Sequence, residues 1–279
     1  MDGILLVNKP SGITSHTLVQ KVRRRLHISR IGHTGTLDPL ASGLMILTVG
    51  KATKILPFMS HFFKEYVATM KLGMRTDTLD ITGTVKEERA VPPISDRQIE
   101  DVLNSFIGES EQLPPMYSAK KVNGIKLYDL ARKDMEVERA RTKITIREIE
   151  LLERKGDLIT FRCLCSTGTY IRVLIEDIAS KLSTIAVMSD LKRTAIDNFH
   201  LSEALEVEQI DENTKPISSY DVLKDYPYVE MEDITDVTNG KKIKLENISA
   251  EVVMITHQHE VVACYERKDD FYYCKRGLW

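Results

Sequence analysis

The sequence has few of the residues that would place it outside the cell or in a membrane. Four of its 279 residues are cysteines, which is too few for the disulfide framework of a secreted protein. The N-terminal apolar run, Ile4 to Val7, is broken at once by Asn8-Lys9-Pro10. It is too short for a signal peptide, and no other segment approaches a membrane span. We therefore expect a cytoplasmic protein without membrane contact.

Metal ligands are equally scarce. Cys163 and Cys165 form a C-x-C pair, but no second pair and no group of histidines lies nearby in the sequence. The two cysteines alternate in phase with Ile159 and Phe161, which is typical of one face of a strand. The pair therefore indicates the buried side of a strand and not a metal site.

The chain has little net charge, −2 in total, but that charge is unevenly distributed. Residues 1–60 hold eight Lys and Arg against two Asp and Glu, a balance of +6, so the remainder carries −8. A basic segment on an otherwise acidic chain indicates a confined site for a polyanion.

Residues 14–27 have the pattern of an amphipathic helix, capped by Thr14 or Ser15. The basic residues on this helix and just after it are Lys21, Arg23, Arg24, Arg25 and Arg30. Most of them lie off the apolar face, so a solvated helix surface is the plainest interpretation. His33 and a glycine-rich loop follow directly, however, and this favours contact with phosphates.

Alternation of apolar residues predicts strands at 44–49, 64–73, 142–153 and 157–166. The last two are expected to pair across the turn at Lys155-Gly156-Asp157.

Two further helices are predicted. Ser95 and Gln98 form a capping box that opens the first, and Gly108 is expected to end it. The second begins near Thr169.

Two segments have a different character. Residues 109–126 carry Pro114-Pro115 and then Lys120 and Lys121, and are expected to form a basic flap. Residues 227–279 contain short strand-like runs and no convincing helix, so we expect a small β-rich domain at the C-terminus.

The densest irregular stretch is residues 32–43, GHTGTLDPLASG. Three glycines in twelve residues permit tight turns and a close approach of the backbone to a ligand. Asp38, before Pro39, is the one acidic residue in this loop. Taken alone it is typical of a turn.

Five segments, in order, resemble the motifs of the TruB-type pseudouridine synthases and together cover roughly residues 3–200. They are LVNKPSG (6–12), GHTGTLDPLASG (32–43), KLGMRTDTLD (71–80), PPMYSAK (114–120) and CSTGTYIR (165–172). Five ordered motifs are far more specific than any single one.

This resemblance implies an α+β fold with a mixed, largely antiparallel central sheet flanked by helices. It implies a catalytic domain at 1–224 and a short PUA-like RNA-binding domain at 225–279. The expected activity is isomerisation of uridine 55 in the tRNA T-loop to pseudouridine. The uridine would be flipped out of the RNA, cleaved at its glycosidic bond and reattached through C5. No metal and no organic cofactor is expected.

The resemblance also assigns roles to individual residues. Asp38 matches the catalytic nucleophile, and a carboxylate needs no separate base to activate it at neutral pH. Arg172 matches the arginine that pairs with this aspartate. The remaining matches are Tyr66 and Tyr170 in the uracil pocket, His33 in the gap left by the flipped base, and Leu191 beside the uracil. Sequence leaves open whether Asp38 attacks the sugar, attacks the base or assists deprotonation of the ribose.

We expect the tRNA T-arm as the partner, held by phosphate contacts from Arg23, Arg24, Arg25, Arg30, Lys120 and Lys121. The stretch KVNGIKLYDLAR (121–132) looks like the stand-alone bacterial form. It therefore favours a monomer that needs no guide RNA and no obligate protein partner. Two alternatives are a guide-RNA-dependent synthase of the same fold and a catalytically silent RNA-binding protein.

Overall fold

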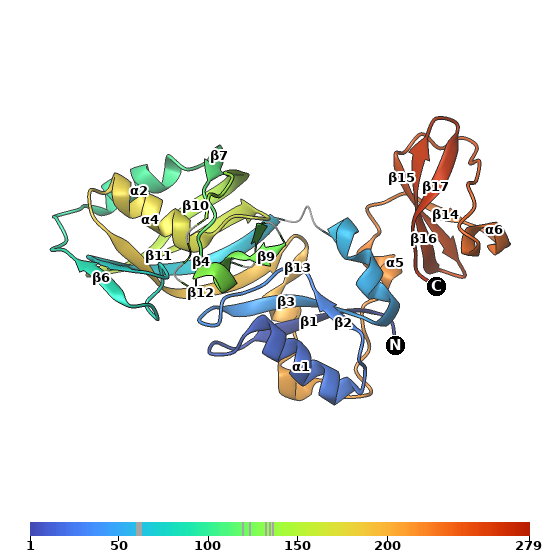
Figure 1. Ribbon diagram of the computed structural model, residues 1–279, viewed down its shortest axis with the longest axis horizontal. Helices are drawn as coiled ribbons and strands as arrows, with labels where there is room; N and C mark the ends of the chain where they lie inside the picture. The colour runs from blue at the N-terminus through green and yellow to red at the C-terminus, as the bar shows by residue number, and fades with distance from the viewer. Residues whose placement is uncertain (60–62, 119, 123, 132, 134, 136) are drawn as a thin grey trace.

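Alternating apolar residues build one large sheet through the middle of the molecule. The computed structural model describes residues 1–59, 63–118, 120–122, 124–131, 133, 135 and 137–279. The sheet runs in the order β1 (Gly3–Lys9), β3 (Ser42–Val49), β12 (Ala186–Ile196), β4 (Phe63–Leu72), β11 (Leu158–Ser166), β10 (Thr142–Lys155) and β7 (Gly108–Gln112) (Figure 1). Two short strands complete it: β2 (Ile31–His33) pairs with β3, and β13 (Phe199–His200) pairs with β12.

Every neighbouring pair in this sheet is antiparallel except β3 and β12, which are parallel. The sheet is therefore mixed and largely antiparallel, as predicted. The predicted pairing of 142–153 with 157–166 is also confirmed, as β10 and β11.

One face of the sheet carries the three longer helices, α1 (Ser15–Leu26), α2 (Asp96–Asn104) and α4 (Ile171–Lys181). Their apolar faces share one core with the inward residues of β4 and β11, among them Ala68, Met70, Phe161 and Cys163. Helix α1 is capped by Thr14, whose side chain accepts from the backbone N–H of Thr17 at 3.0 Å. The capping box of α2 is present as predicted.

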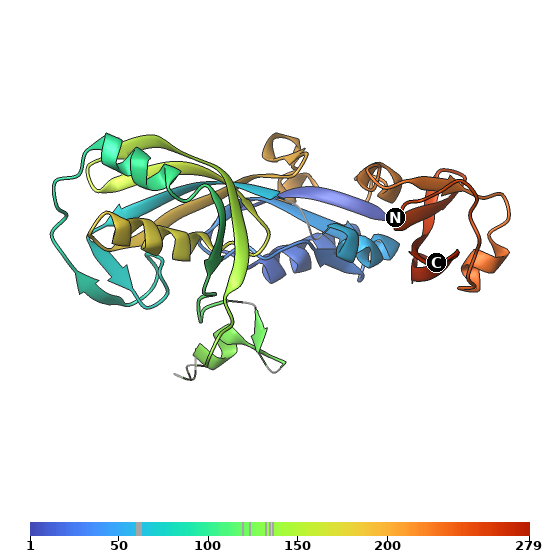
Figure 2. The same cartoon turned by 90° about the horizontal axis from the view of Figure 1, so that it is seen from above.

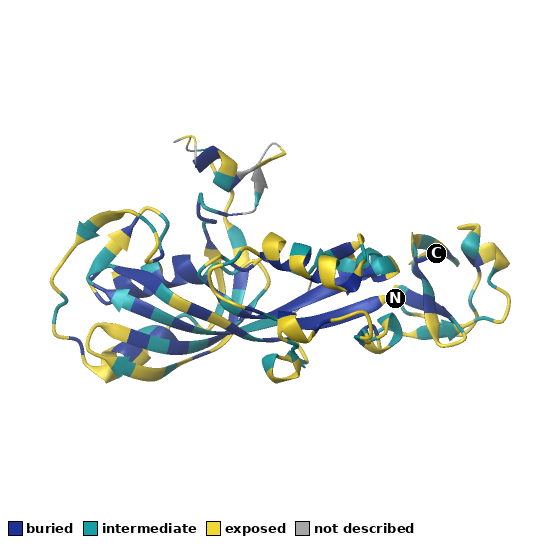
Figure 3. Ribbon diagram, turned by 90° about the horizontal axis from the view of Figure 1, so that it is seen from below, coloured by how far each residue is buried: buried dark blue, intermediate teal, exposed yellow. Residues whose placement is uncertain are grey.

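The opposite face is covered only at its β1–β3 end. There η1 (Gly50–Met59) packs with the C-terminal segment in a second apolar cluster that includes Ile4, Leu44, Phe58 and Leu278. Figure 3 shows β1 and β3 buried along their length, whereas strands at the other end of the sheet alternate between buried and more exposed residues. On that open face Arg162 pairs with Glu65, Glu148 and Glu150.

Residues 113–141 leave the body of the protein as a flap, which projects to one side in Figure 2. The flap holds the short hairpin β8 (Lys121–Val122) and β9 (Ile125–Lys126), followed by α3 (Leu127–Ala131). A second hairpin, β5 (Met74–Thr76) with β6 (Val85–Glu88), extends from the end of β4. Shorter turns, η2 (Leu201–Glu203), η3 (Val207–Gln209) and α5 (Ser219–Val222), lead toward the C-terminal segment.

The C-terminal segment forms a separate four-stranded sheet, seen at the right of Figure 1. Its strands are β14 (Tyr228–Glu230), β15 (Val252–His257), β16 (Glu260–Lys268) and β17 (Phe271–Gly277). The predicted β-rich character is confirmed. The boundary at 224/225 stays a prediction.

Three local predictions were wrong. The helix opened by Ser95 ends at Asn104, and Gly108 instead starts β7 with φ +114°. Residues 109–112 belong to this edge strand and not to the flap, because they pair with β10. The C-terminal segment contains one helical turn, α6 (Thr235–Thr238), which has too few residues for a helical period to appear in the sequence. In the part of the chain that the structure describes, no helix is both long and apolar enough to cross a membrane.

The second apolar cluster predicts that the two sheets depend on each other. Leu278 is 5% exposed and packs in the same cluster as residues of β1, β3 and η1. Lys54 adds a hydrogen bond from Nζ to the main-chain oxygen of Trp279 at 2.7 Å. We expect Leu278→Ala to lower the free energy of unfolding by about 2–5 kcal/mol in urea titrations.

The control is Leu152→Ala, because Leu152 is 48% exposed and its loss should change stability by no more than about 0.5 kcal/mol. Equal effects of the two substitutions would show that the C-terminal segment does not stabilise the central sheet.

Candidate active site

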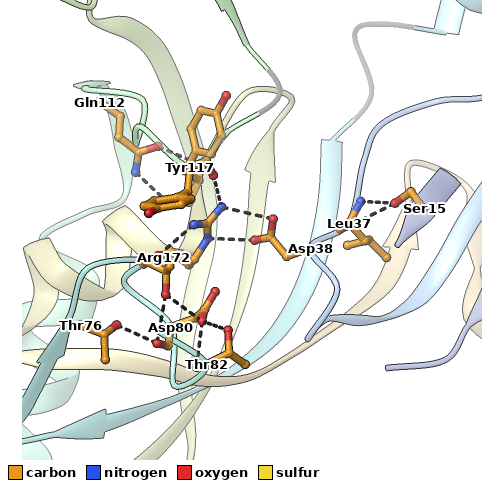
Figure 4. A network of polar contacts seen from close by, with 11 residues as sticks. Ser15, Leu37, Asp38, Thr76, Asp80, Thr82, Gln112, Tyr117 and Arg172 are labelled. Atoms are coloured by element: carbon orange, nitrogen blue, oxygen red, sulfur yellow. Dashed lines mark hydrogen bonds and ion pairs between the residues drawn. The ribbon is translucent and has the colours of Figure 1, made fainter. Parts of the chain in front are cut away.

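The loop that carries Asp38 connects β2 to β3 and is tied down on both sides. Leu37 is buried, and its backbone N–H donates to Oγ of Ser15 at 2.9 Å (Figure 4). Lys9 is fully buried and donates from Nζ to the carbonyl oxygens of Ala41, at 2.6 Å, and Pro39, at 3.4 Å. The start of α1 and the end of β1 thus hold the loop on either side of Asp38.

Arg172 grips the Asp38 carboxylate with two nitrogens. Its Nε lies 2.8 Å from Oδ2, and one terminal nitrogen donates to Oδ1 at 3.2 Å. The arginine side chain is 5% exposed and the aspartate side chain 33%. The expected bidentate pair is therefore present, and it leaves one side of the carboxylate open to solvent.

Two main-chain carbonyls fix the guanidinium itself. Arg172 donates to the oxygen of Thr78 at 2.9 Å and to that of Tyr117 at 2.8 Å (Figure 4). The Thr78 turn is held in place by the Asp80 carboxylate, which accepts from the backbone N–H of Thr82 at 2.9 Å. Arg172 therefore joins the loop between β5 and β6, the base of the flap and the loop that carries Asp38.

A cavity of about 270 Å³ opens beside this ion pair. The predicted residues that line it are Asp38, Tyr66, Tyr170, Arg172 and Leu191. Tyr170 caps α4, and both its N–H and its carbonyl bond to the side-chain amide of Gln112, at 2.7 and 3.1 Å. The fold thus brings together five residues from four separate parts of the chain.

Three cationic side chains, of Lys9, Lys64 and Arg193, lie near the loop that carries Asp38 and are wholly or partly buried. Burial lowers the pKa of Lys9 to about 8, against the charge of Asp38, which raises it. Burial also lowers the pKa of Lys64 to about 8, and the charge of Arg193 adds to this effect. Arg193 is 1% exposed and donates from Nε to the carbonyl of Leu44 at 2.7 Å. Burial raises the pKa of Tyr66, against the opposing charge of Arg193.

His33 lies beside the cavity and not in its wall. It ends β2, and its Nε2 is 3.3 Å from Oγ1 of Thr36. Burial lowers its pKa, and the charges of Arg193 and His16 act in the same direction. Each of these effects favours the neutral imidazole over the charged one.

Some of the residues predicted to contact phosphates are already hydrogen-bonded to the protein itself. Arg23 donates to the carbonyl of Ile31 at 2.9 Å, and Arg25 to those of Glu208 and Ile210 at 3.1 and 3.3 Å. These two arginines have structural partners that a helical pattern cannot reveal. Arg24 is exposed on the same helix.

The other predicted contacts have partners of their own or are only partly described. Arg30 donates to Oγ1 of Thr53 at 2.8 Å and remains exposed. Lys120 donates to Oγ1 of Thr142 at 2.7 Å. Lys121 starts β8, and its side chain lies outside the described residues.

Sequence reasoning missed Lys9, Lys64, Arg193 and Ser118 as members of the site. Lys64 and Ser118 line the cavity, and the Ser118 hydroxyl is buried without a hydrogen-bond partner among the residues that the structure describes. Lys9 and Ser118 lie inside two of the five motifs, and that position could have identified them as site residues. Lys64 has the same strand phase as Tyr66, but a lysine at the end of a strand is usually solvated.

The sheet and the aspartate–arginine pair in a nucleotide-sized cavity are typical of the pseudouridine synthases. The sequence model of the TruB family pseudouridylate synthase (N terminal domain) matches residues 23–171. The chain belongs to the TruB family.

Curated relatives agree with this assignment. The chain is 40% identical to a protein of Mesoplasma florum named tRNA pseudouridine synthase B, over 99% of this chain and 97% of that protein. It is 43% identical to the protein of the same name from Clostridium kluyveri, over 91% and 89%. Among solved structures, it resembles a chain of a Cbf5-Nop10-Gar1 complex with a TM-score of 0.73 and 25% identity, over 99% of this chain and 85% of that one.

The geometry of Arg172 predicts that lysine cannot replace it. A single ammonium cannot span both carboxylate oxygens and the two carbonyls that the guanidinium reaches. We expect Arg172→Lys to slow single-turnover release of tritium from [5-³H]uridine-labelled tRNA by about 100-fold or more.

Arg162→Lys is the matched control, because Arg162 also binds carboxylates but lies on the open face of the sheet. The tritium-release rate of Arg162→Lys should stay within about twofold of the wild-type rate. Normal turnover by Arg172→Lys would show that the pairing with Asp38 is irrelevant to catalysis.

Proposed function

We propose that this protein converts uridine 55 in the T-loop of tRNA to pseudouridine, with Asp38 as the nucleophile. The observation that carries the proposal is the bidentate contact between Arg172 and Asp38 at the edge of the cavity. The curated relatives bear the name tRNA pseudouridine synthase B, and they match nearly the whole chain.

The cavity supports a flipped nucleotide as the reacting species. C5 and the glycosidic bond of a uridine in folded RNA are buried, so the base must leave its stack at a cost of a few kcal/mol. Tyr66, Tyr170 and Leu191 line the cavity and would support a base, while Asp38, in the same wall, would face the sugar. His33, beside the cavity, is placed to fill the gap that the base leaves.

The two contacts from Arg172 hold the Asp38 carboxylate in one orientation and leave part of it exposed to the cavity. An ionised carboxylate can attack C1′ of the ribose, attack the base, or assist removal of a ribose proton. Each route breaks the bond between N1 and C1′ and forms one between C5 and C1′. The C5 proton is lost and N1 gains one, so the reaction is balanced without an oxidant, a reductant or a cofactor.

Binding of the tRNA would come from the basic side of the molecule. Arg24 and Arg30 are exposed and have the most freedom to reach RNA, whereas Lys120 would first have to leave its hydrogen bond to Thr142. Recognition of the stem would follow its shape. The C-terminal sheet would act as a short PUA-like module. It carries more acidic than basic residues, so we propose only a small, local contact there.

The experiment that tests the function uses the purified chain and one unmodified tRNA transcript, with EDTA present after the RNA has folded. We expect pseudouridine at position 55 alone, because the proposed chemistry needs only Asp38 and the site that orients it. The product is mapped by carbodiimide labelling and primer extension. A transcript with cytidine at position 55 is the control and should gain none.

This experiment also separates the alternatives. A requirement for guide RNA would assign the chain to the guided synthases, and binding without any product would make it a silent RNA-binding protein. A strict need for added metal beyond RNA folding would refute the proposed chemistry.

The nucleophile has its own test. We expect Asp38→Asn to abolish turnover, by about 10⁴-fold or more, while tRNA affinity does not fall, because few phosphate contacts involve this side chain. Single-turnover rates and filter binding measure the two effects. Asp157→Asn, in the exposed turn between β10 and β11, is the control and should behave as wild type. Activity of Asp38→Asn within tenfold of wild type would exclude the assignment.

A further inference from the structure

Lys64 is a cation of the cavity wall that the proposed chemistry has not yet used. It lies on β4, two residues before Tyr66 and on the same face of the strand. Its ammonium sits directly on Gly35, because a Cβ added to Gly35 would lie 2.9 Å from Nζ. Gly35 belongs to the loop that carries Asp38, so a bare α-carbon there makes room for the lysine.

This ammonium has no carboxylate partner within the described ranges of the chain. The groups that act on its charge are Arg193, which opposes it, and Cys165. Arg193 reaches the same place, with a terminal nitrogen 4.0 Å from the position of a Gly35 Cβ, and that nitrogen is buried with no hydrogen-bond acceptor in the described part of the chain. Asp38, the acidic residue of the cavity wall, is already bound to Arg172.

The described part of the site therefore holds more positive than negative charge. Burying like charges together is unfavourable unless an anion completes the site. An RNA substrate can supply a negative charge in two ways: a backbone phosphate, or the uracil itself once its glycosidic bond has broken.

The lining of the cavity favours the uracil. Lys64 and Tyr66 lie two residues apart on one face of β4, and both line the cavity that Asp38 also lines. With C1′ of the ribose at Asp38 and the base against Tyr66, a carbonyl oxygen at the edge of the base would come within reach of the Lys64 ammonium.

We propose that Lys64 is a catalytic residue, whose ammonium donates a hydrogen bond to a uracil carbonyl oxygen and stabilises the detached base. When the bond from N1 to C1′ breaks, the electron pair stays on the base, and its negative charge spreads from N1 onto the carbonyl oxygens. Electrostatic stabilisation of such a developing charge in a partly desolvated site is a large catalytic effect. The inference rests on the proposed function, since it requires glycosidic cleavage in this cavity.

The test compares Lys64→Met, which keeps the length of the side chain without its charge, with Lys64→Arg, which keeps the charge. We expect Lys64→Met to slow single-turnover conversion of saturating tRNA by about 100-fold, with the Kd for tRNA within about twofold of wild type. Lys64→Arg should recover most of the rate. A fall in tRNA affinity at an unchanged rate would mean a phosphate contact, and would overturn the proposal, as would no change in either quantity.

A pH profile keeps the proposal open to refutation if Lys64→Met does not fold. Raising the pH removes the proton from Lys64, whose pKa lies near 8, so the wild-type rate should fall as the pH rises above about 8. Lys64→Arg stays charged and should show no such fall up to about pH 9.5. A decline at the same pH in Lys64→Arg would belong to another group, Lys9 among them, and would overturn the assignment.

The two proposals fail separately. If wild type forms no pseudouridine in tRNA, the proposed function fails whatever Lys64 does. If wild type is active and Asp38→Asn is not, an unaffected Lys64→Met rate removes only the role of Lys64.

Discussion

The ion pair between Arg172 and Asp38 is the contact on which the rest of the site depends. One guanidinium holds the carboxylate and two main-chain carbonyls, and so joins α4 to the loop that carries Asp38, the Thr78 turn and the base of the flap. Desolvating such a pair is costly, and its geometry must be good to offset that cost. Here the arginine makes three hydrogen bonds and one further ion-pair contact, whereas a third of the aspartate side chain remains exposed. Arg172 is therefore held firmly by its partners, and Asp38 remains accessible from the cavity.

The division of the sheet into two covered regions explains where the cavity can form. Helices α1, α2 and α4 cover one face of the sheet and share one apolar core with β4 and β12. Tyr66 on β4 and Leu191 on β12 belong to this core and also line the cavity. The opposite face is covered at the β1–β3 end by η1 and the C-terminal segment. Because β1 and β3 are buried on both sides, they form a firm base for the loop between β2 and β3.

Electrostatics sets this site apart from a generic basic surface. Lys9, Arg172 and Arg193 are almost fully buried, and Lys64 is partly buried at the cavity wall. Cations in such positions are less screened by salt than those on the exposed side of α1. In the proposed function, the buried set would act on a single nucleotide, while exposed residues such as Arg24 would act on the RNA backbone at longer range. Charge would then have two separate uses, orientation within the cavity and attraction outside it.

The alternation of apolar residues by itself determined the main strands, and the helical period determined α1 and α4, because each pattern reports which side of an element is buried. The five ordered motifs identified the family and contain Asp38, Tyr170 and Arg172, while the wider resemblance to that family pointed to Tyr66 and Leu191. Tertiary structure alone decided that Gly108 begins an edge strand, since pairing with β10 is a contact between distant segments. It also decided that Arg23 and Arg25 bond to backbone carbonyls, and that Lys64 and Arg193 meet at Gly35. Periodicity describes one segment at a time, whereas hydrogen-bond partners and buried charge arise only when several segments pack together.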